Sequence, residues 1–275
     1  MTLDEASQLG EAGDWGSAAE LLARALEDHP SDPSLFCWLG VAERELGLSG
    51  VAHERFKACL ALEPSDPHLL AVVGNALAAF DDPDAEPALR SAALLAPDLA
   101  LARWAYGAYL AREGLFEQAI VELRAARDLD PDDGTAAYEL GVALALSGDA
   151  SGAAEAFGRA AELDPEDDWA IVVFGLALLE SAGPGEALPE LAAGAQARPD
   201  DVEAQLLAAL AAGAEGEERL AWEMLERGRL VGATADRVLT DAVEEQLEEG
   251  PDAARAFLLG ELAPTVYRER LLQRP

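Results

Sequence analysis

The chain has 275 residues, of which 51% are hydrophobic and 26% charged, so it can bury a sizeable core. Acidic residues outnumber basic residues 53 to 19, which gives a formal net charge of −34. This balance excludes a broad phosphate-binding surface, so we expect no nucleic-acid partner, and it disfavours docking on an anionic membrane. Alanine and leucine are the commonest residues, and both favour helices, so a sheet-rich fold is not expected.

Three series of residues recur along the chain at steps of 33 or 34 residues. The prolines are Pro30, Pro64, Pro97, Pro131, Pro165 and Pro199, and the glycines are Gly40, Gly74, Gly107, Gly141 and Gly175. The alanines are Ala18, Ala52, Ala85, Ala119, Ala153, Ala187, Ala221 and Ala254, each followed four residues later by Leu or Phe. Small residues let two helices approach closely, and a proline ends a helix. The period therefore predicts a succession of helix pairs.

On these residues the sequence resembles the tetratricopeptide repeat family, whose 34-residue unit forms a helix–turn–helix. The fifth unit fits the family pattern with Leu140, Gly141, Leu144, Ala153, Phe157, Ala160 and Pro165. The resemblance implies an all-α, right-handed solenoid, and it covers residues 1–262 as about eight helix pairs. The third unit is one residue short between Asp81 and Asp84, and the last two units (201–233 and 235–262) lack the closing proline. Residues 263–275, with Thr265 to Gln273 at their centre, are predicted to form a C-terminal capping helix.

By the same resemblance, the first helices of successive units line a concave groove. In chain order the predicted groove residues are Trp38 and Val41; His68, Val72 and Asn75; Leu101, Trp104, Ala108 and Arg112; Tyr138 and Val142; Trp169, Val172, Val173 and Leu176; and Leu206 and Leu210. Most are apolar or aromatic, and they include three of the five tryptophans. The helix expected over Trp169–Leu179 has no charged residue, so it must bury more than one face. These features predict a non-catalytic scaffold whose groove binds an apolar or amphipathic segment of another protein, which flanking basic residues would help to attract.

Three alternatives remain open for the same apolar surface. The chain can form a homodimer, the C-terminal helix can fold back into the groove, or the protein can be an accessory subunit of an enzyme complex. The family's clamp for two carboxylates, by contrast, needs Lys, Asn and Arg in the groove. Only Asn75 and Arg112 qualify, because the single lysine, Lys57, falls on a second helix.

No motif in the sequence predicts a catalytic, cofactor or metal site. Residues Asp128 to Glu139 imitate the acid spacing of a calcium loop, but Pro131 and Gly134 do not fit the loop's turn. The two cysteines, Cys37 and Cys59, form neither a zinc motif nor a disulfide framework. The N-terminal segment is acidic and the longest charge-free runs have 11 residues, so we expect neither a signal peptide nor a membrane span. The sequence thus predicts a cytoplasmic protein.

Overall fold

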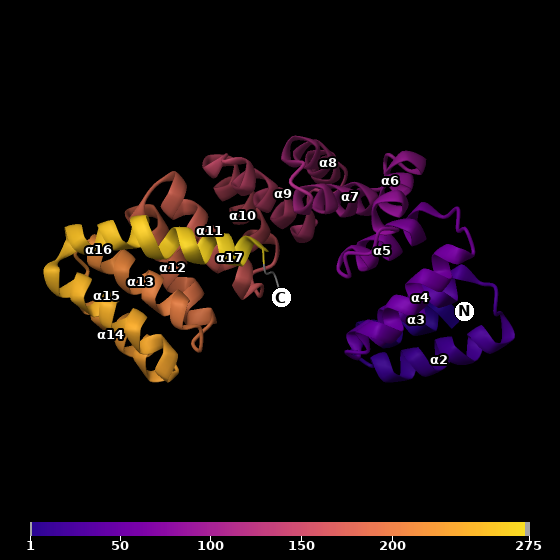
Figure 1. Ribbon diagram of the computed structural model, residues 1–275, viewed down its shortest axis with the longest axis horizontal. Coiled ribbons are helices and arrows are strands. Elements are labelled where there is room, and N and C mark those ends of the chain that lie inside the picture. Colours follow the sequence, from indigo (N-terminus) through magenta and orange to yellow (C-terminus); the bar gives the residue numbers. More distant parts are fainter. Residues whose placement is uncertain (1, 273–275) are drawn as a thin grey trace. The chain divides into compact units, whose positions relative to one another are not determined.

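The computed structural model describes residues 2–272, which form helices and short connections without a strand in that range (Figure 1). The chain divides into two units, Met1–Asp130 and Pro131–Pro275, called here the N-terminal unit and the C-terminal unit. The predicted all-α class and the succession of helix–turn–helix pairs are confirmed. Residues 273–275 of the predicted cap lie outside the described range.

The N-terminal unit consists of four consecutive helix pairs, and in each pair the two helices pack against each other. They are α1 (Thr2–Glu11) and α2 (Trp15–Asp28), α3 (Pro33–Glu45) and α4 (Ser49–Ala61), α5 (Pro67–Ala78) and α6 (Ala85–Leu95), and α7 (Ala100–Arg112) and α8 (Phe116–Leu129). The first helices of successive pairs, α1, α3, α5 and α7, also contact one another in order. Their outward sides therefore form one continuous face of this unit.

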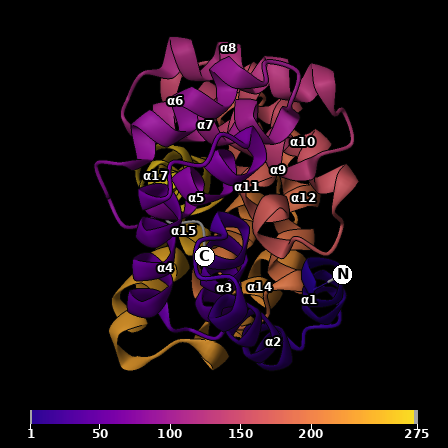
Figure 2. The same ribbon diagram turned by 90° about the vertical axis from the view of Figure 1, so that its right-hand side faces the viewer.

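The C-terminal unit continues the pairing over its described residues (Figure 1) and ends with an additional helix, labelled α17 in Figures 1 and 2. Its helices are α9 (Gly134–Ser147), α10 (Ala150–Leu163), α11 (Asp168–Ser181), α12 (Pro184–Ala197), α13 (Val202–Ala214), α14 (Glu218–Val231), the short 3₁₀ helix η1 (Thr234–Asp236), α15 (Arg237–Glu249), α16 (Pro251–Phe257), the π-helical turn η2 (Leu258–Leu262) and α17 (Ala263–Leu272). No loop separates α16 from α17, because η2 joins them as one helical run. The helix predicted after residue 262 is therefore present as α17.

Aspartate side chains define where many of the first helices begin. Asp32, Asp66, Asp133, Asp167 and Asp201 each stand two residues after a proline of the 34-residue series. Each accepts a hydrogen bond from a backbone N–H in the first turn of the helix that follows, at 2.9–3.1 Å. The proline ends one helix, and the aspartate satisfies donors that the next helix leaves unpaired. Part of the protein's acidity is thus a consequence of capping the repeats.

Glycines of the 34-residue series allow the two helices of a pair to touch. A Cβ atom on Gly141 would lie 2.6 Å from the ring of Phe157, and one on Gly40 would lie 2.8 Å from the ring of Phe56. Both phenylalanines are fully buried. Because no side chain fits at these crossings, the glycine of the first helix and the large residue of the second helix form a matched contact.

The shortened third repeat is held by a local polar cluster. His53 Nε2 lies 2.8 Å from Asp82 Oδ2, and Lys57 Nζ donates to Asp82 Oδ1 at 3.1 Å and to Asp84 at 2.5 Å. Burial by itself would raise the pKa of Asp82, but the backbone N–H of Asp84 and the His53 and Lys57 side chains lower it to about 2. The single lysine of the chain, Lys57, therefore links α4 by ion pairs to the irregular turn between α5 and α6.

Candidate partner-binding surfaces

The predicted groove residues of the N-terminal unit lie on the face formed by α3, α5 and α7, and most are accessible. His68 and Arg112 are exposed, and half-buried positions are Trp38, Val41, Val72, Asn75, Leu101 and Trp104. Ala108, the remaining one, is buried. The eight accessible residues are called the N-terminal face from here on. The rings of Trp38 and His68 are 6.2 Å apart, so this face is continuous between α3 and α5.

The apolar members of the N-terminal face are anchored in the core at one edge. Trp38 packs against the cluster that contains Leu22 and Leu39, whereas Val41 and Val72 pack against the cluster around Phe56. Each of these three side chains is therefore held against the core while part of its surface stays in contact with water. Fixed, half-buried aromatic and aliphatic groups are well suited to a protein interface, because little conformational entropy is lost on binding.

A cavity of about 430 Å³ adjoins this face at the start of the chain. Apolar side chains from α1, α2 and α3 line it, among them Leu3, Trp15 and Trp38. Trp38 therefore borders both the cavity and the N-terminal face. Helix α1 contributes to this cavity, but no predicted groove residue lies on α1, so the cavity was not expected from the repeat pattern.

In the C-terminal unit the predicted groove residues are mostly part of the core. Those that are buried are Tyr138, Val142, Val172, Val173, Leu176, Leu206 and Leu210. Val172 faces Gly194 of α12, and Leu206 faces Gly228 of α14. These two side chains therefore fill the space between the paired helices, which corrects the expectation that they are open to a partner. Only Trp169 is half-buried.

Helix α17 packs on α11 and presents one stripe of buried residues to the unit. The stripe consists of Ala263, Val266, Tyr267 and Arg270, spaced as one face of a helix. Arg268, between them in sequence, is exposed. The contact includes Trp169, a predicted groove residue, so α17 lies on the side of α11 that was expected to form the groove.

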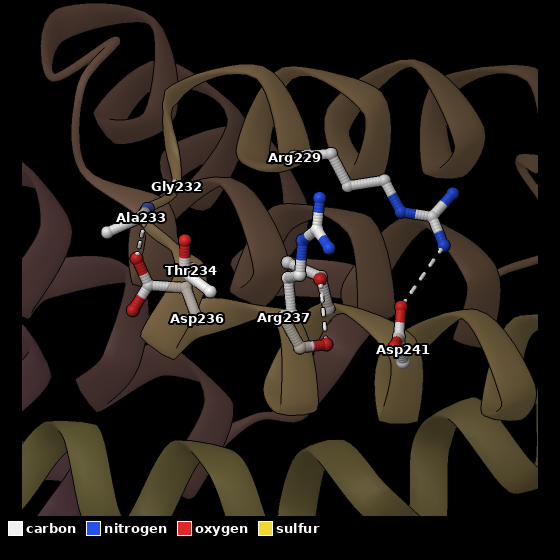
Figure 3. Close-up of a pocket in the computed structure, with 8 residues that line it drawn as sticks. Arg229, Gly232, Ala233, Thr234, Asp236, Arg237 and Asp241 are labelled. Atoms are coloured by element: carbon white, nitrogen blue, oxygen red, sulfur yellow. Dashed lines mark hydrogen bonds and ion pairs between the residues drawn. The ribbon is translucent and has the colours of Figure 1, made fainter.

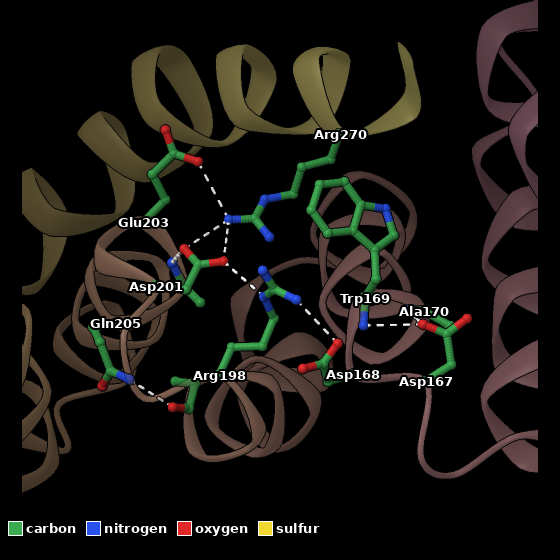
Figure 4. Close-up of polar contacts among 11 residues, drawn as sticks. Asp167, Asp168, Trp169, Ala170, Arg198, Asp201, Glu203, Gln205 and Arg270 are labelled. Carbon is green, nitrogen blue, oxygen red and sulfur yellow. Dashed lines mark hydrogen bonds and ion pairs between the residues drawn. The ribbon is translucent and has the colours of Figure 1, made fainter. Parts of the chain in front are cut away.

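Two arginines meet the ring of Trp169, as Figure 4 shows. The guanidinium carbons of Arg270 and Arg198 lie 5.1 Å and 5.3 Å from the ring centroid, within the range of cation–π contacts. The indole N–H of Trp169 donates to the hydroxyl of Tyr138 at 3.0 Å. The tryptophan is thus oriented by α9 and stacked by groups from α17 and from the end of α12.

Asp201 is the acidic centre of this cluster. Its carboxylate accepts hydrogen bonds from Arg270 at 2.7 and 2.8 Å and from Arg198 at 3.0 Å, while it also caps α13. Burial would raise the pKa of Asp201. The backbone N–H of Ala204 and the side chains of Arg270 and Arg198 together lower it. Glu203 is a weaker partner at 3.3 Å, and burial raises its pKa. At neutral pH the buried guanidinium of Arg270 is therefore matched mainly by Asp201.

Not every polar atom beneath α17 has a partner. On α17, the hydroxyl of Tyr267 and the Nε and Nη1 atoms of Arg270 are buried without a hydrogen bond. A buried polar atom without a partner lowers the stability of the contact that buries it. The fit of α17 to α11 and α13 is therefore apolar and ionic, but incomplete in hydrogen bonding.

A second cavity, of about 400 Å³, lies beside α14 and α15 and is lined by side chains of both charges, including Arg229, Arg237, Asp236 and Asp241 (Figure 3). Its carboxylates are engaged: Asp236 accepts the Ala233 N–H at 2.7 Å, and Asp241 lies 3.9 Å from Arg229. Within residues 2–272, no group of three or more His, Cys, Asp and Glu side chains is placed to hold a metal ion.

The architecture defines a helical repeat protein, and the comparisons give its family. The tetratricopeptide repeat family profile matches residues 3–67 and 110–168. The thermophilic tetratricopeptide repeat protein TTC0263 of Thermus thermophilus is 26% identical, over 65% of this chain and 97% of that one, with a TM-score of 0.53. The matched segments and this solved structure support a protein of the tetratricopeptide repeat family.

Other solved structures share the fold at lower identity. PilF of Pseudomonas aeruginosa is 19% identical over 76% of this chain and 96% of its own, with a TM-score of 0.63. The Cut9–Hcn1 hetero-tetramer of the APC/C is matched at 17% identity over 88% of this chain and 48% of that one, with a TM-score of 0.69. Among curated proteins, no sequence matches the chain. In the described part of the chain, no helix is long and apolar enough to cross a membrane.

Proposed function

We propose that this tetratricopeptide repeat protein is a non-catalytic interaction scaffold, and that its N-terminal face binds an apolar or amphipathic segment of a partner protein. One observation carries the proposal: predicted groove residues are accessible on α3, α5 and α7, whereas on α9, α11 and α13 most are buried. Trp38 and Trp104 are the expected anchors, because large aromatic side chains contribute much of the binding energy at interfaces.

The charge of the chain indicates what kind of partner would approach this face. With a net charge of −34, the protein attracts basic segments and repels acidic ones over distances of about a Debye length. We therefore propose that the bound segment is flanked by basic residues, which raise the rate of encounter more than the final affinity. The two free cysteines, Cys37 and Cys59, suit a reducing compartment, and we place the complex in the cytoplasm.

The test compares the full chain with three variants: Trp38→Ala, Trp104→Ala and, as a control, Val121→Ala. Val121 is 65% exposed on α8, a second helix, so its loss removes apolar surface outside the N-terminal face. A partner is isolated by affinity capture from the native organism, purified, and titrated against each variant by calorimetry. Each tryptophan variant is expected to bind at least about tenfold more weakly, a difference of about 1.4 kcal/mol, and the control to bind as the parent does. Equal affinity of all four proteins would exclude the N-terminal face as the binding surface.

The second candidate is that the chain fills part of its own groove, and one observation favours it. In the C-terminal unit the chain's own helix α17 packs on Trp169, so part of the predicted groove surface is covered internally. This covering is intramolecular, and we therefore expect the protein to be a monomer. Light scattering of the full chain at several concentrations measures the molar mass, and a dimer that dissociates on Trp38→Ala substitution would favour a homodimer through the N-terminal face instead.

A further inference from the structure

Helix α17 packs on the rest of the C-terminal unit through one of its faces. It packs on α11, and its buried stripe is Ala263, Val266, Tyr267 and Arg270. Arg270 reaches across to the start of α13 (Figure 4). The surface beneath it combines an aromatic ring, Trp169, with two carboxylates, Asp201 and Glu203. An aromatic ring beside carboxylates is a site for a guanidinium group, because both attract the same cation.

Arg270 is the specific part of this contact. Its side chain is 5% exposed, stacks on Trp169 and forms two hydrogen bonds with Asp201. Arg268, two residues earlier on the same helix, is exposed. The surface therefore selects one of the two arginines by its position, three residues after Tyr267. This spacing is the feature that another helix would have to reproduce.

Two features distinguish α17 from a permanently fixed part of the core. The hydroxyl of Tyr267 and two nitrogens of Arg270 are buried without hydrogen-bond partners, so the contact is not fully satisfied. In addition, α17 is joined to α16 through the π-helical turn Leu258–Leu262, which contains Gly260. A π-helical turn often marks a functional position in a helix. This turn is the candidate hinge at which α17 would separate from α16.

We propose that the surface formed by Trp169, Arg198, Asp201 and Glu203 is a second docking site, that α17 occupies it in the free protein, and that an amphipathic helix of a partner protein displaces α17. The partner helix carries an arginine three residues after an aromatic residue, as α17 does. This site is separate from the N-terminal face and does not depend on it. Because α17 is tethered, its effective concentration is high, and an outside helix binds weakly until α17 is loosened.

The experiment uses the full chain and a fluorescent peptide with the sequence of residues 258–272 as the partner helix. Arg270→Ala weakens α17, and Arg268→Ala is the matched control. Fluorescence anisotropy is expected to show at least tenfold tighter peptide binding to Arg270→Ala than to the parent, and no change for Arg268→Ala. A peptide whose arginine equivalent to Arg270 is replaced by Glu should not bind. Adding Trp169→Ala to the Arg270→Ala protein should abolish binding, whereas adding Trp38→Ala should leave it unchanged.

A second variant tests the proposal in the opposite direction and guards against misfolding of Arg270→Ala. Tyr267→Phe removes a buried hydroxyl without a partner, so α17 should dock more firmly and the peptide should bind at least threefold more weakly than to the parent. Unchanged peptide binding across Arg270→Ala and Tyr267→Phe, with α17 amides equally protected from hydrogen exchange, would mean that α17 is a fixed cap and would overturn the proposal. Dimers of Arg270→Ala that exchange α17 would overturn it as well, because the occupant would then be a second copy of the chain.

Discussion

Arg270 and Asp201 form a two-point contact at 2.7 and 2.8 Å although 69 residues separate them in the sequence. The same carboxylate caps α13 and accepts a hydrogen bond from Arg198. One residue of the repeat pattern thus serves a local role, as the N-cap of its helix, and a long-range role, as the partner of the buried guanidinium on α17.

Replacing Asp201 should therefore cost more stability than replacing an ordinary cap. Asp201→Ala removes the cap and leaves the guanidinium of Arg270 buried with a weaker partner, for an expected loss of about 3 kcal/mol in the free energy of unfolding. Asp133→Ala removes a cap of the same kind on α9 and is expected to lose about 1 kcal/mol. Urea unfolding followed by circular dichroism measures both. Equal losses would show that the contact with Arg270 adds nothing to stability.

Replacing a glycine by alanine should change the free energy of unfolding in opposite directions at Gly141 and Gly50. Gly141→Ala places a Cβ atom 2.6 Å from Phe157, and the expected loss is about 1–3 kcal/mol because the helix pair must separate. Gly50→Ala on α4 meets nothing within 4 Å, so the more helix-favouring residue should add about 0.5 kcal/mol. Thermal unfolding of the two variants gives the comparison. A stabilised Gly141→Ala protein would contradict the matched contact between Gly141 and Phe157.

The Asp82 cluster predicts a loss of stability in acid. The folded pKa of Asp82 is about 2, below the ordinary value of 3.8, so the ionised form stabilises the folded state. This contribution is fully present above about pH 4 and is lost as the pH falls toward 2. Its size is about 1 kcal/mol, since His53 and Lys57 are partly open to solvent.

Asp82→Asn should remove this dependence on pH. The difference in unfolding free energy between the parent and the variant should shrink as the pH falls from 4 to 2, when both are measured by denaturant titration. A difference that stays constant over that range would mean that Asp82 does not titrate with a lowered pKa. Asp128→Asn is the control, because Asp128 is largely exposed and its ion pair is with its neighbour Arg127.

The two cysteines should be inert in the folded protein. Cys37 and Cys59 are both completely buried in the core of the second repeat. The hydrogen bond with Cys59 and burial both raise the pKa of the Cys37 thiol, so little thiolate is available there. A coloured thiol reagent should react at least about a hundredfold more slowly with the native protein than with the chain in denaturant. Fast reaction of one thiol in native buffer would show that the second repeat opens.

The local organisation of this protein could be read from its sequence, because each element depends on neighbours within one repeat. The proline and the aspartate two residues later mark where helices end and begin, and Gly141 with Phe157 marks where they cross. The packing of α17 on Trp169 could not be predicted in this way. Arg270 lies 101 residues after Trp169, and nothing in the 34-residue period relates them.

The sequence by itself determined an all-α succession of helix pairs and the series of side chains on the first helices. Only the tertiary structure decided which of those side chains stay accessible. Trp38 and Trp104 are half-buried on α3 and α7, whereas Val173 and Leu176 are buried on α11. The physical reason is that repeat periodicity encodes contacts between adjacent helices, whereas exposure depends on every segment that packs nearby, including α17 from the far end of the chain.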